Sequence, residues 1–527
     1  MSHHAISRFM SLAVPGLMAV AGAALAWPAA AAADSIDSSW APHARSGSIA
    51  EQLPEADAQW AAIDTPRPDL VQRVKSGDLA VANAGWWGFE AEDSTDALQS
   101  ALDSGASHVV IPNLGVAWRT GPLRLRSDQT VLFEPGVVVQ AVSGGPFARL
   151  GSTLFRAIHD ENIVLWGPGA TLKMNYEEYV TGEHRHAVAI LGSRNVVIEG
   201  LAITGSGGDG VYVGRGLTDR GGPVACENIV LRDLTIHRHR RQGVSVISCR
   251  NFLMERSEVF DIHGTAPQGG IDFEPNQQDE PLQNCVVRQC SFTDLGGSVI
   301  LGITHQYDDQ SPPISILFED NFVSSPNRTV MYIGPFKAGV RGTITIRNST
   351  IEGRAGSGLL MLDKHADGPL VTVENSRFVV LDGPKPGNPV IGFRTSGSAY
   401  KSAAVTGNLV LRDVIIEDPH DRPVVGFDRG DRNGEVARVR GEITVRSPHA
   451  PRVDLRDAPI DLTLNHERTT PVTAGVRLAA HERMAPALQQ TRQATALPQP
   501  TLMWSFDQGD VPHILVRGRQ PDARLQL

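Results

Sequence analysis

The stretch Asn228-Ile229-Val230-Leu231 decides the fold, because close copies of it recur along the chain. Each copy is a short β-branched or apolar run, and successive copies follow at roughly 23 to 38 residues. In the earlier copies an asparagine stands immediately before the run. These asparagines are Asn162, Asn195, Asn228, Asn251 and Asn284, and later runs without one are Ile316-Leu317-Phe318, Ile344-Thr345-Ile346, Val371-Thr372-Val373 and Leu409-Val410-Leu411.

A second set of short runs lies between the first. It includes Val211-Tyr212-Val213, Val244-Ser245-Val246, Ile271-Asp272-Phe273 and Val299-Ile300-Leu301. Strands this short, with no helical stretches between them, cannot form βαβ units, and they bury their apolar side only by stacking on neighbouring repeats. The pattern therefore predicts an all-β, single-stranded parallel β-helix with Ile, Val, Leu and Phe stacked inside. The asparagines are expected to form a structural ladder between coils.

Composition agrees with a turn-rich β protein. The chain has 527 residues, with 52 glycines, 34 prolines and 6% aromatic residues. Its 48 Lys and Arg against 58 Asp and Glu give a net charge of −10. This balance argues against a nucleic acid or an anionic membrane surface as the partner.

The N-terminus has the layout of a secretory signal. Arg8 precedes an apolar run from Phe9 to Trp27, and the small residues Ala31-Ala32-Ala33 follow. We expect a signal peptide at 1–33, an N-terminal extension at 34–90, the parallel β-helix at 91–465 and a C-terminal cap or tail at 466–527. The protein is then exported to the periplasm or the exterior, with no membrane attachment after signal removal.

Ahead of the repeat, Asp93 to Leu102 reads as a capped amphipathic helix that would cover the open end of the solenoid. This helix, Val109-Val110-Ile111-Pro112 and Gly121-Pro122-Leu123 resemble the opening of the pectate-lyase/polygalacturonase-like right-handed parallel β-helix proteins. The blocks Gly207 to Tyr212, Arg241 to Val246 and Gly264 to Asn276 resemble exported bacterial proteins of this group. The resemblance implies a right-handed helix and activity on polysaccharides, over roughly residues 85 to 440.

Two signatures of known members of that superfamily are missing. The paired aspartates followed by Gly-His-Gly of polygalacturonases are absent, and Arg241-Gln242-Gly243 occupies a comparable place. The Tyr-Gly-x-Asp-Pro-His pattern of alginate epimerases is absent as well. Plain pectin hydrolysis is therefore not what these residues indicate.

Aligning the coils predicts which side chains meet. Val211, Val244 and Ile271 should face the core, so strand alternation turns Tyr212, Ser245 and Asp272 outward together. One step before the strand glycines, His186, Asp209, Gln242 and Gly269 should align, and one step earlier Arg185, Gly208, Arg241 and Gln268. Because neighbouring coils lie about 4.8 Å apart, these residues should form one patch.

The sharpest pair in this patch is Asp272 and Glu274. Both point away from the core, with Cβ atoms about 6 to 7 Å apart, and carboxyl separations of about 5 to 9.5 Å cover retaining and inverting glycoside hydrolysis. One acid would need a raised pKa, which a like-charged neighbour promotes. We predict that both are catalytic. The alternative is that Glu274 caps a turn or pairs with an arginine while Asp272 is solvated.

Asp209 is the third catalytic candidate. The sequence Gly208-Asp209-Gly210 is a natural turn into a strand, and equally its glycines leave the carboxylate open to a sugar. Arg241 would orient a sugar hydroxyl or carboxylate by forked hydrogen bonds. The full set of predicted substrate-binding residues is Arg241, Gln242, Tyr212, His186, Arg185, His263 and Gln268.

No cofactor is predicted, although a lyase would bring Ca²⁺ into question. Asp308-Asp309 or Glu177-Glu178 would supply oxygen ligands, but neither pair has a specific spacing. Cys226 and Cys249 each precede their asparagine by two residues, so they should stack, and a disulfide between them is as good an expectation as two free thiols. Cys285 and Cys290 read as core residues.

Three functions compete. An exported glycoside hydrolase leads, with Asp272 and Glu274 as its carboxylates and a polysaccharide or oligosaccharide as its substrate. The second is a lyase or epimerase on a uronic-acid glycan, for which Arg185, Arg241 and His186 would supply the cations. The third is a non-catalytic glycan-binding solenoid. The mixture of carboxylates, Arg and Tyr in one patch favours the enzymes.

Overall fold

The computed structural model describes most of the chain from residue 66 to residue 470. The described ranges are 66–148, 151–180, 183–216, 224–325, 329–354, 356–381, 388–395, 405–428, 434–455 and 460–470, together with the backbone of two strands at 501–505 and 513–517. The predicted signal peptide at 1–33 and most of the predicted tail at 466–527 lie outside these ranges.

Three-residue apolar runs are long enough for one short strand, and here each pairs in parallel with its counterpart in the next coil. One strand series, sheet B, has 12 strands. They are β4 (Leu123–Arg124), β7 (Phe155–Ile158), β10 (Val188–Leu191), β13 (Val211–Gly214), β16 (Gln242–Val246), β19 (Gly269–Phe273), β22 (Val299–Ile300), β25 (Met331–Ile333), β28 (Leu359–Leu362), β31 (Ile391–Arg394), β33 (Val425–Phe427) and β35 (Val453–Asp454).

The 24-stranded sheet A contains two further parallel series. The first is β1 (Val81–Asn83), β2 (His108–Ile111), β5 (Gln129–Phe133), β8 (Glu161–Trp166), β11 (Arg194–Glu199), β14 (Cys226–Arg232), β17 (Cys249–Glu255), β20 (Leu282–Arg288), β23 (Ile314–Glu319), β26 (Gly342–Arg347) and β29 (Leu370–Glu374). The second is β3 (Trp118–Thr120), β6 (Val138–Ala141), β9 (Thr171–Lys173), β12 (Ala202–Thr204), β15 (Thr235–His239), β18 (Glu258–Ile262), β21 (Ser291–Thr293), β24 (Phe322–Ser325), β27 (Thr350–Gly353) and β30 (Arg377–Val380).

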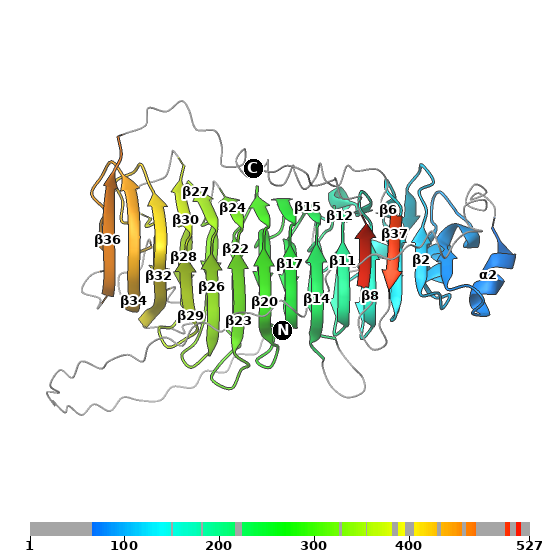
Figure 1. Cartoon of the computed structure of the whole chain (residues 1–527), viewed down its shortest axis with the longest axis horizontal. Coiled ribbons are helices and arrows are strands. Elements are labelled where there is room, and N and C mark those ends of the chain that lie inside the picture. Colours follow the sequence, from blue (N-terminus) through cyan, green and yellow to red (C-terminus); the bar gives the residue numbers. More distant parts are fainter. Residues whose placement is uncertain are drawn as a thin grey trace, which may run out of the picture. The chain divides into compact units, whose positions relative to one another are not determined.

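The two series of sheet A merge in the last coils into the long strands β32 (Val405–Glu417), β34 (Glu435–Ser447) and β36 (Ile460–Arg468). Figure 1 shows the strands of successive coils stacked side by side, from β2 to β36. The predicted parallel β-solenoid is confirmed. Its parallel pairing begins with β1 and β2, before the predicted boundary at residue 91.

Both faces of the first series are apolar. Ile229 and Leu231 point into the core, where they stack on Val196 and Ile198 of the preceding coil. The residue between them, Val230, belongs to a second buried apolar cluster with its counterparts in neighbouring coils. Parallel strands buried on both faces read as continuous apolar runs, which explains why the sequence shows triplets rather than alternation.

The asparagines form the predicted ladder. Each side-chain amide donates to the side-chain carbonyl of the preceding asparagine at 2.8 Å, from Asn284 back through Asn251, Asn228 and Asn195 to Asn162. All five adopt a left-handed backbone conformation with φ between 53° and 58°. Asparagine tolerates this conformation better than other residues with a Cβ, so the same residue serves both the turn and the ladder.

A second ladder carries alternating charge. Register pairs place Glu199, Arg232, Glu255, Arg288, Glu319, Arg347, Glu374 and Arg412 in one row on successive coils. At its centre Glu255 is 3% exposed and receives Arg232 at 2.7 Å and Arg288 at 2.6 Å. We call this row the charge ladder. Every member therefore stacks on opposite charges, which a parallel repeat needs to avoid like-charge repulsion.

The predicted N-terminal helix is present as α3 (Thr95–Leu102), and it buries Leu98, Ala101 and Leu102 in the core. A preceding helix, α2 (Pro68–Lys75), packs on β1 and on the 3₁₀ turn η1 (Ala84–Trp87). Short turns of helix also occur at α4 (Gly145–Ala148) and η2 (Tyr176–Glu178). In the predicted tail, β37 (Thr501–Ser505) and β38 (His513–Arg517) form an antiparallel pair.

Cys226 and Cys249 stack in register as predicted, and of the two alternatives the structure has two free thiols, not a disulfide. The Cys226 thiol points to the carbonyl of Gly214 at 3.1 Å, whereas the Cys249 thiol points to the carbonyl of Arg250 at 3.5 Å. Burial raises the pKa of Cys226 to about 12, so the thiol form is favoured. Cys285 and Cys290 are buried in the core as expected.

Within the described residues, every helix is too short or too polar to cross a lipid bilayer.

The asparagine ladder predicts a stability effect at Asn228. Asn228→Ala removes two side-chain hydrogen bonds and leaves a residue with a Cβ in the left-handed region, which together cost about 1–3 kcal/mol. Urea unfolding measures this loss. Asn228→Gly removes the same hydrogen bonds without the backbone cost, so it should fall between wild type and Asn228→Ala. A glycine variant less stable than the alanine variant would contradict this account.

The charge ladder predicts a pH-dependent effect at Glu255. Burial alone would raise the pKa of Glu255, but Arg256, Arg232 and Arg288 together hold it below its usual range. The carboxylate therefore stabilises the fold above its unfolded pKa, and this contribution is lost as the pH falls through the folded value. Glu255→Gln should cost about 3 kcal/mol at pH 7 and progressively less toward pH 3. Thermal melts test this, with the exposed Glu227→Gln on β14 as control; a pH-independent loss would refute it.

Candidate functional site

The predicted patch lies on the outer face of sheet B, where three neighbouring strands present polar side chains. Parallel pairing places Tyr212 of β13, Ser245 of β16 and Asp272 of β19 in one row. Gln242 of β16 pairs with Gly269 of β19 in a second row. Both rows were predicted from the strand alternation, and both are confirmed.

Glycines let these coils approach closely at the base of the patch. A Cβ on Gly243 would lie 2.5 Å from the carbonyl oxygen of Gly270, and one on Gly210 would lie 2.7 Å from that of Gly243. Only a residue without a side chain fits at either position. Asp209 and Gln242 immediately precede these glycines. The close approach of the coils therefore places both residues near Asp272.

Asp272 is buried at the centre of the patch. Its Oδ2 accepts a hydrogen bond of 2.7 Å from the amide of Gln242, which is itself held by the backbone N–H of Gly269 at 2.7 Å. Its Oδ1 receives no donor from the protein. Burial, the charge of Glu274 and a hydrogen bond to Glu274 raise the pKa of Asp272 well above its usual range, against the opposing charge of Arg241. The surroundings of Asp272 therefore favour the protonated carboxyl over the carboxylate.

The predicted pair of Asp272 and Glu274 lies at the end of β19. The strand ends at Phe273, so Glu274 follows it directly. The charge of Glu274 contributes to the raised pKa of Asp272, which indicates that the two carboxyls lie near each other. Glu274 also lies 3.7 Å from the guanidinium of Arg241, so the pairing with an arginine that the alternative interpretation expected is present, whereas Asp272 is buried and not solvated.

Arg241 joins three carboxylates. Its guanidinium lies 3.4 Å from Oδ1 of Asp209, 3.7 Å from Oε2 of Glu274 and 3.3 Å from Oε2 of Glu183. We call Asp209, Arg241, Asp272, Glu274 and Glu183 the carboxylate cluster. Asp209 and Asp272 are fully buried, whereas the side chains of Glu274 and Glu183 are 25% and 51% exposed. The cluster therefore extends from two buried carboxyls to two partly exposed ones.

Asp209 has an electrostatic environment of its own. Burial raises its pKa to about 6, with Arg241 pulling in the opposite direction. At neutral pH it is mostly ionised, in contrast to Asp272. Two carboxyls whose surroundings separate their pKa values in this way are suited to opposite roles in acid–base catalysis.

His186 and Tyr212 pack beside the buried part of the carboxylate cluster. Their rings stack with centroids 4.6 Å apart, and the backbone N–H of Asp209 donates to Nδ1 of His186 at 3.1 Å. Burial lowers the pKa of His186 to about 3, helped by nearby His184 and Arg241. The histidine is therefore a neutral acceptor, not the cation that a uronate-binding role would need. Burial likewise raises the pKa of Tyr212 to about 12.

Three predicted substrate-binding residues have other contacts. Arg185 donates to the backbone carbonyls of Phe147 at 2.8 Å and Ala148 at 3.1 Å. His263 pairs with Asp294 at 3.0 Å, and the side chain of Gln268 accepts from the backbone N–H of Gly264 at 3.1 Å. The structure thus assigns these side chains to holding loops.

The carboxylates considered as calcium ligands for a lyase take part in hydrogen bonds and ion pairs. Asp308 accepts from Gln278 at 2.6 and 2.7 Å, and Glu177 pairs with Arg238 at 2.5 Å. Within the described residues, a different group has metal-ligand spacing: potential ligand atoms of Asp261, His263 and Asp294 lie within 4.8 Å of one another. This group lies at the surface, outside the carboxylate cluster.

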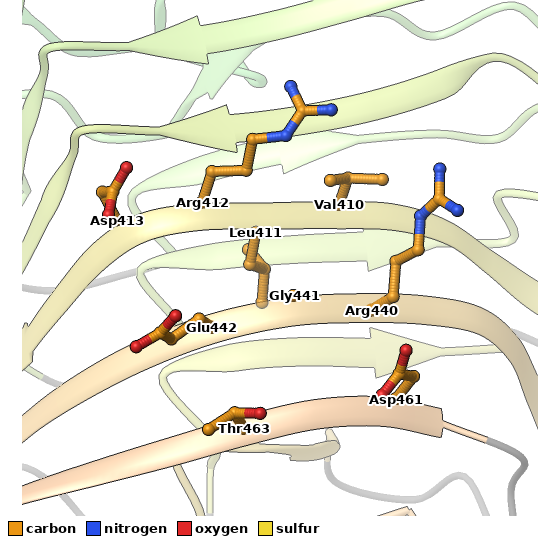
Figure 2. Close-up of a pocket in the computed structure, with 9 residues that line it drawn as sticks. All are labelled: Val410, Leu411, Arg412, Asp413, Arg440, Gly441, Glu442, Asp461 and Thr463. Carbon is orange, nitrogen blue, oxygen red and sulfur yellow. The ribbon is translucent and has the colours of Figure 1, made fainter. Parts of the chain in front are cut away.

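A cavity of about 500 Å³ lies elsewhere, on sheet A. Figure 2 shows Arg412 of β32 and Arg440 of β34 extending to the same side, with Asp461 of β36 beside Arg440. The cavity follows the shift in register between Leu411 and Val414, where the pairing of β32 with β34 slips. None of the predicted site residues lines it. It also lacks a buried carboxyl, so the carboxylate cluster remains the better candidate for chemistry.

Glu183 was not predicted. It lies in the loop before β10, outside the strand register from which the patch was derived. Tyr332 of β25 was also missed, although it follows Asp272 and Ile300 in the same outward row. Extending the strand alignment two coils further would have found Tyr332. No periodic signal marks Glu183.

Comparisons with known proteins agree on the fold. A family model described as the right handed beta helix region matches residues 161–334. The chain is similar in structure to the A-module of the mannuronan C-5 epimerase AlgE6 from Azotobacter vinelandii, with a TM-score of 0.52, 16% identity, and coverage of 74% of this chain and 100% of that one. A family 28 exopolygalacturonase from Yersinia enterocolitica gives 0.45, with 16% identity and coverage of 74% and 79%.

The match to a curated relative covers a smaller share of both proteins. The chain is 24% identical over 259 residues to the uncharacterized protein YclG of Bacillus subtilis (strain 168), a match that covers 43% of each protein. The chain thus matches less than half of this relative's length. Together with the strand register, these findings establish that the chain is a right-handed parallel β-helix protein.

The raised pKa of Asp209 predicts a testable dependence of stability on pH. Its folded value of about 6 exceeds the value of 3.8 for a free aspartate, so the folded state loses stability as the pH rises between these values, by about 3 kcal/mol in total. Asp209→Asn has no such loss. The melting temperature of the variant relative to wild type should therefore be higher at pH 7 than at pH 4. An equal difference at both pH values would contradict the assignment.

Proposed function

We propose that this protein is a glycoside hydrolase acting on a polysaccharide or oligosaccharide. The observation that carries the proposal is the carboxylate cluster, in which a buried, protonated carboxyl and ionised carboxylates meet around one arginine. Glycoside hydrolysis needs an acid to protonate the leaving oxygen and a carboxylate to act as base or nucleophile. A glycan substrate is also consistent with a fold shared with a module whose name identifies it as a mannuronan epimerase.

In this mechanism Asp272 is the general acid. Gln242 donates to its Oδ2, which leaves Oδ1 to carry the acidic proton. Glu274 keeps Asp272 protonated in the resting site and can return a proton to it from solvent, because its own carboxylate is partly exposed. After the leaving group has taken the proton, the negative charge on Asp272 is stabilised by Arg241.

Asp209 is the base or nucleophile in this proposal. It is mostly ionised at neutral pH and lies 3.4 Å from the guanidinium of Arg241. Asp209 and Glu274 approach Arg241 through different nitrogens, so the guanidinium lies between these two carboxyls.

A lyase or epimerase is less well supported by the same residues. Elimination or epimerisation of a uronate needs a base for a carbon-bound proton and a cation for the sugar carboxylate. His186 is neutral but buried and already accepts a hydrogen bond, Tyr212 has a pKa of about 12, and Arg185 is bound to backbone carbonyls. Of the three cations considered for this alternative, His186 and Arg185 are thus engaged elsewhere, and Arg241 already pairs with three carboxylates.

Export to the periplasm or exterior is part of the proposal. It rests on the signal-like layout of residues 1–33. Size comparison of the cellular and exported protein, with N-terminal sequencing, tests it. A mature N-terminus near Asp34 is the expected result.

The catalytic roles are tested by Asp272→Asn and Asp209→Asn. After a screen of glycans for release of reducing ends has identified a substrate, each variant should lower kcat by about 10²–10⁴-fold, because each removes a proton-transfer group or nucleophile. Glu274→Gln should lower kcat less and alter the pH profile, since it removes the negative charge that raises the pKa of Asp272. Asp309→Asn, which changes an exposed aspartate outside the cluster, is the matched control.

Full activity in both aspartate variants would overturn the mechanism. Product absorbance near 235 nm separates hydrolysis from elimination, because only elimination leaves an unsaturated sugar. An increase at that wavelength would favour the lyase.

A further inference from the structure

The charge balance of the carboxylate cluster bears on which sugar it accepts. Arg241 is surrounded by three carboxylates, those of Asp209, Glu274 and Glu183, at 3.3 to 3.7 Å. One guanidinium therefore faces three negative charges, and the buried Asp272 adds no positive charge. A sugar that carried its own carboxylate would enter a site whose net charge already repels it.

Other arginines near the cluster are held in contacts of their own. Arg185 donates to a backbone carbonyl, and the guanidinium of Arg240 lies over the ring of Tyr176, 4.8 Å from its centroid. Both keep their positive charge, but these contacts occupy their guanidinium groups. On the opposite side, where Asn276 and Glu280 approach Tyr212, Arg215 pairs with Asp279 at 2.9 Å.

Because two further arginines lie on the same face of sheet B, the charge argument applies only to the sugar unit beside Asp272. Arg124 of β4 and Arg156 of β7 occupy the outward row of sheet B, on coils that precede β10 and β13. They lie at least two coils from Tyr212, or about 10 Å, which is the length of roughly two sugar units. A charged unit bound there would not contact Asp272.

We infer that the sugar unit bound against Asp272 and Arg241 is neutral, a hexose or an N-acetylhexosamine, and not a uronate. This inference rests on the proposed function and names its substrate class. Hydroxyl groups suit the site, because the paired carboxylates and the amide of Gln242 offer acceptors and donors without requiring a counter-charge. Arg241 then acts as an internal counter-ion that keeps Asp209 ionised, instead of binding substrate charge.

The test compares polymers that differ only in charge. Polygalacturonate and polymannuronate are each paired with their carboxyl-reduced forms, which keep the linkage but carry neutral sugars, within a wider panel of neutral glycans. Binding is measured by affinity electrophoresis, and cleavage by release of reducing ends. We expect neutral members to be bound and cleaved at least about tenfold better than their uronate counterparts.

The variant Glu183→Gln tests the charge argument on the protein itself. It removes one of the three carboxylates at Arg241 from the exposed edge of the cluster, so binding of the uronate polymers should strengthen by several-fold to about tenfold. Glu177→Gln is the matched control: this exposed glutamate pairs with Arg238, outside the cluster, and its removal should leave the preference unchanged.

The outcomes separate this inference from the proposed function. A uronate polymer handled as well as its reduced form, or equal effects of Glu183→Gln and Glu177→Gln, would overturn the inference while leaving the hydrolase intact. Failure to bind or cleave any glycan in the panel would overturn the proposed function, and this inference with it.

Discussion

Stacking of each coil on the next through parallel backbone hydrogen bonds is the constraint on which the rest of this structure depends. It places each residue about 4.8 Å from its counterpart in the neighbouring coil, so every side chain must be compatible with its own repeat position. Asparagine satisfies this requirement by donating from one amide to the next, from Asn284 back to Asn162. The charge ladder satisfies it by alternating Glu and Arg, with Glu255 between Arg232 and Arg288.

The carboxylate cluster departs from this rule. Instead of alternating with equal numbers of cations, Asp209, Glu274 and Glu183 converge on Arg241, and Asp272 lies buried beside them. Such an arrangement costs stability, and two features limit the cost: the pKa of Asp272 is raised, which favours its neutral form, and Gln242 donates to its Oδ2. Unfavourable electrostatics retained at one place on an otherwise well-paired solenoid are typical of a functional site.

Much of the fold and part of the site followed from periodicity. The repeated triplets identified the solenoid, the asparagines identified the ladder, and alternation placed Tyr212, Ser245 and Asp272 in one row. Three features could not be predicted from periodicity. The charge ladder spans coils of unequal length, and Glu183 comes from a loop outside the strand register. Cys226 and Cys249 stack without forming a disulfide because their thiols point to different carbonyls. Each depends on side-chain direction or loop path, which strand spacing does not encode.

The sequence by itself determined the parallel β-helix, its register over the central coils and the face on which the polar residues gather. These are consequences of a two-residue strand period and of a repeat that buries its apolar side only by stacking. Tertiary structure alone decided the chemistry of that face. Burial and proximity, which no spacing reveals, raised the pKa values of Asp272 and Asp209, rendered His186 neutral and surrounded Arg241 with carboxylates. A pKa depends on dielectric surroundings and on distances of a few ångströms, and those are set by the folded loops.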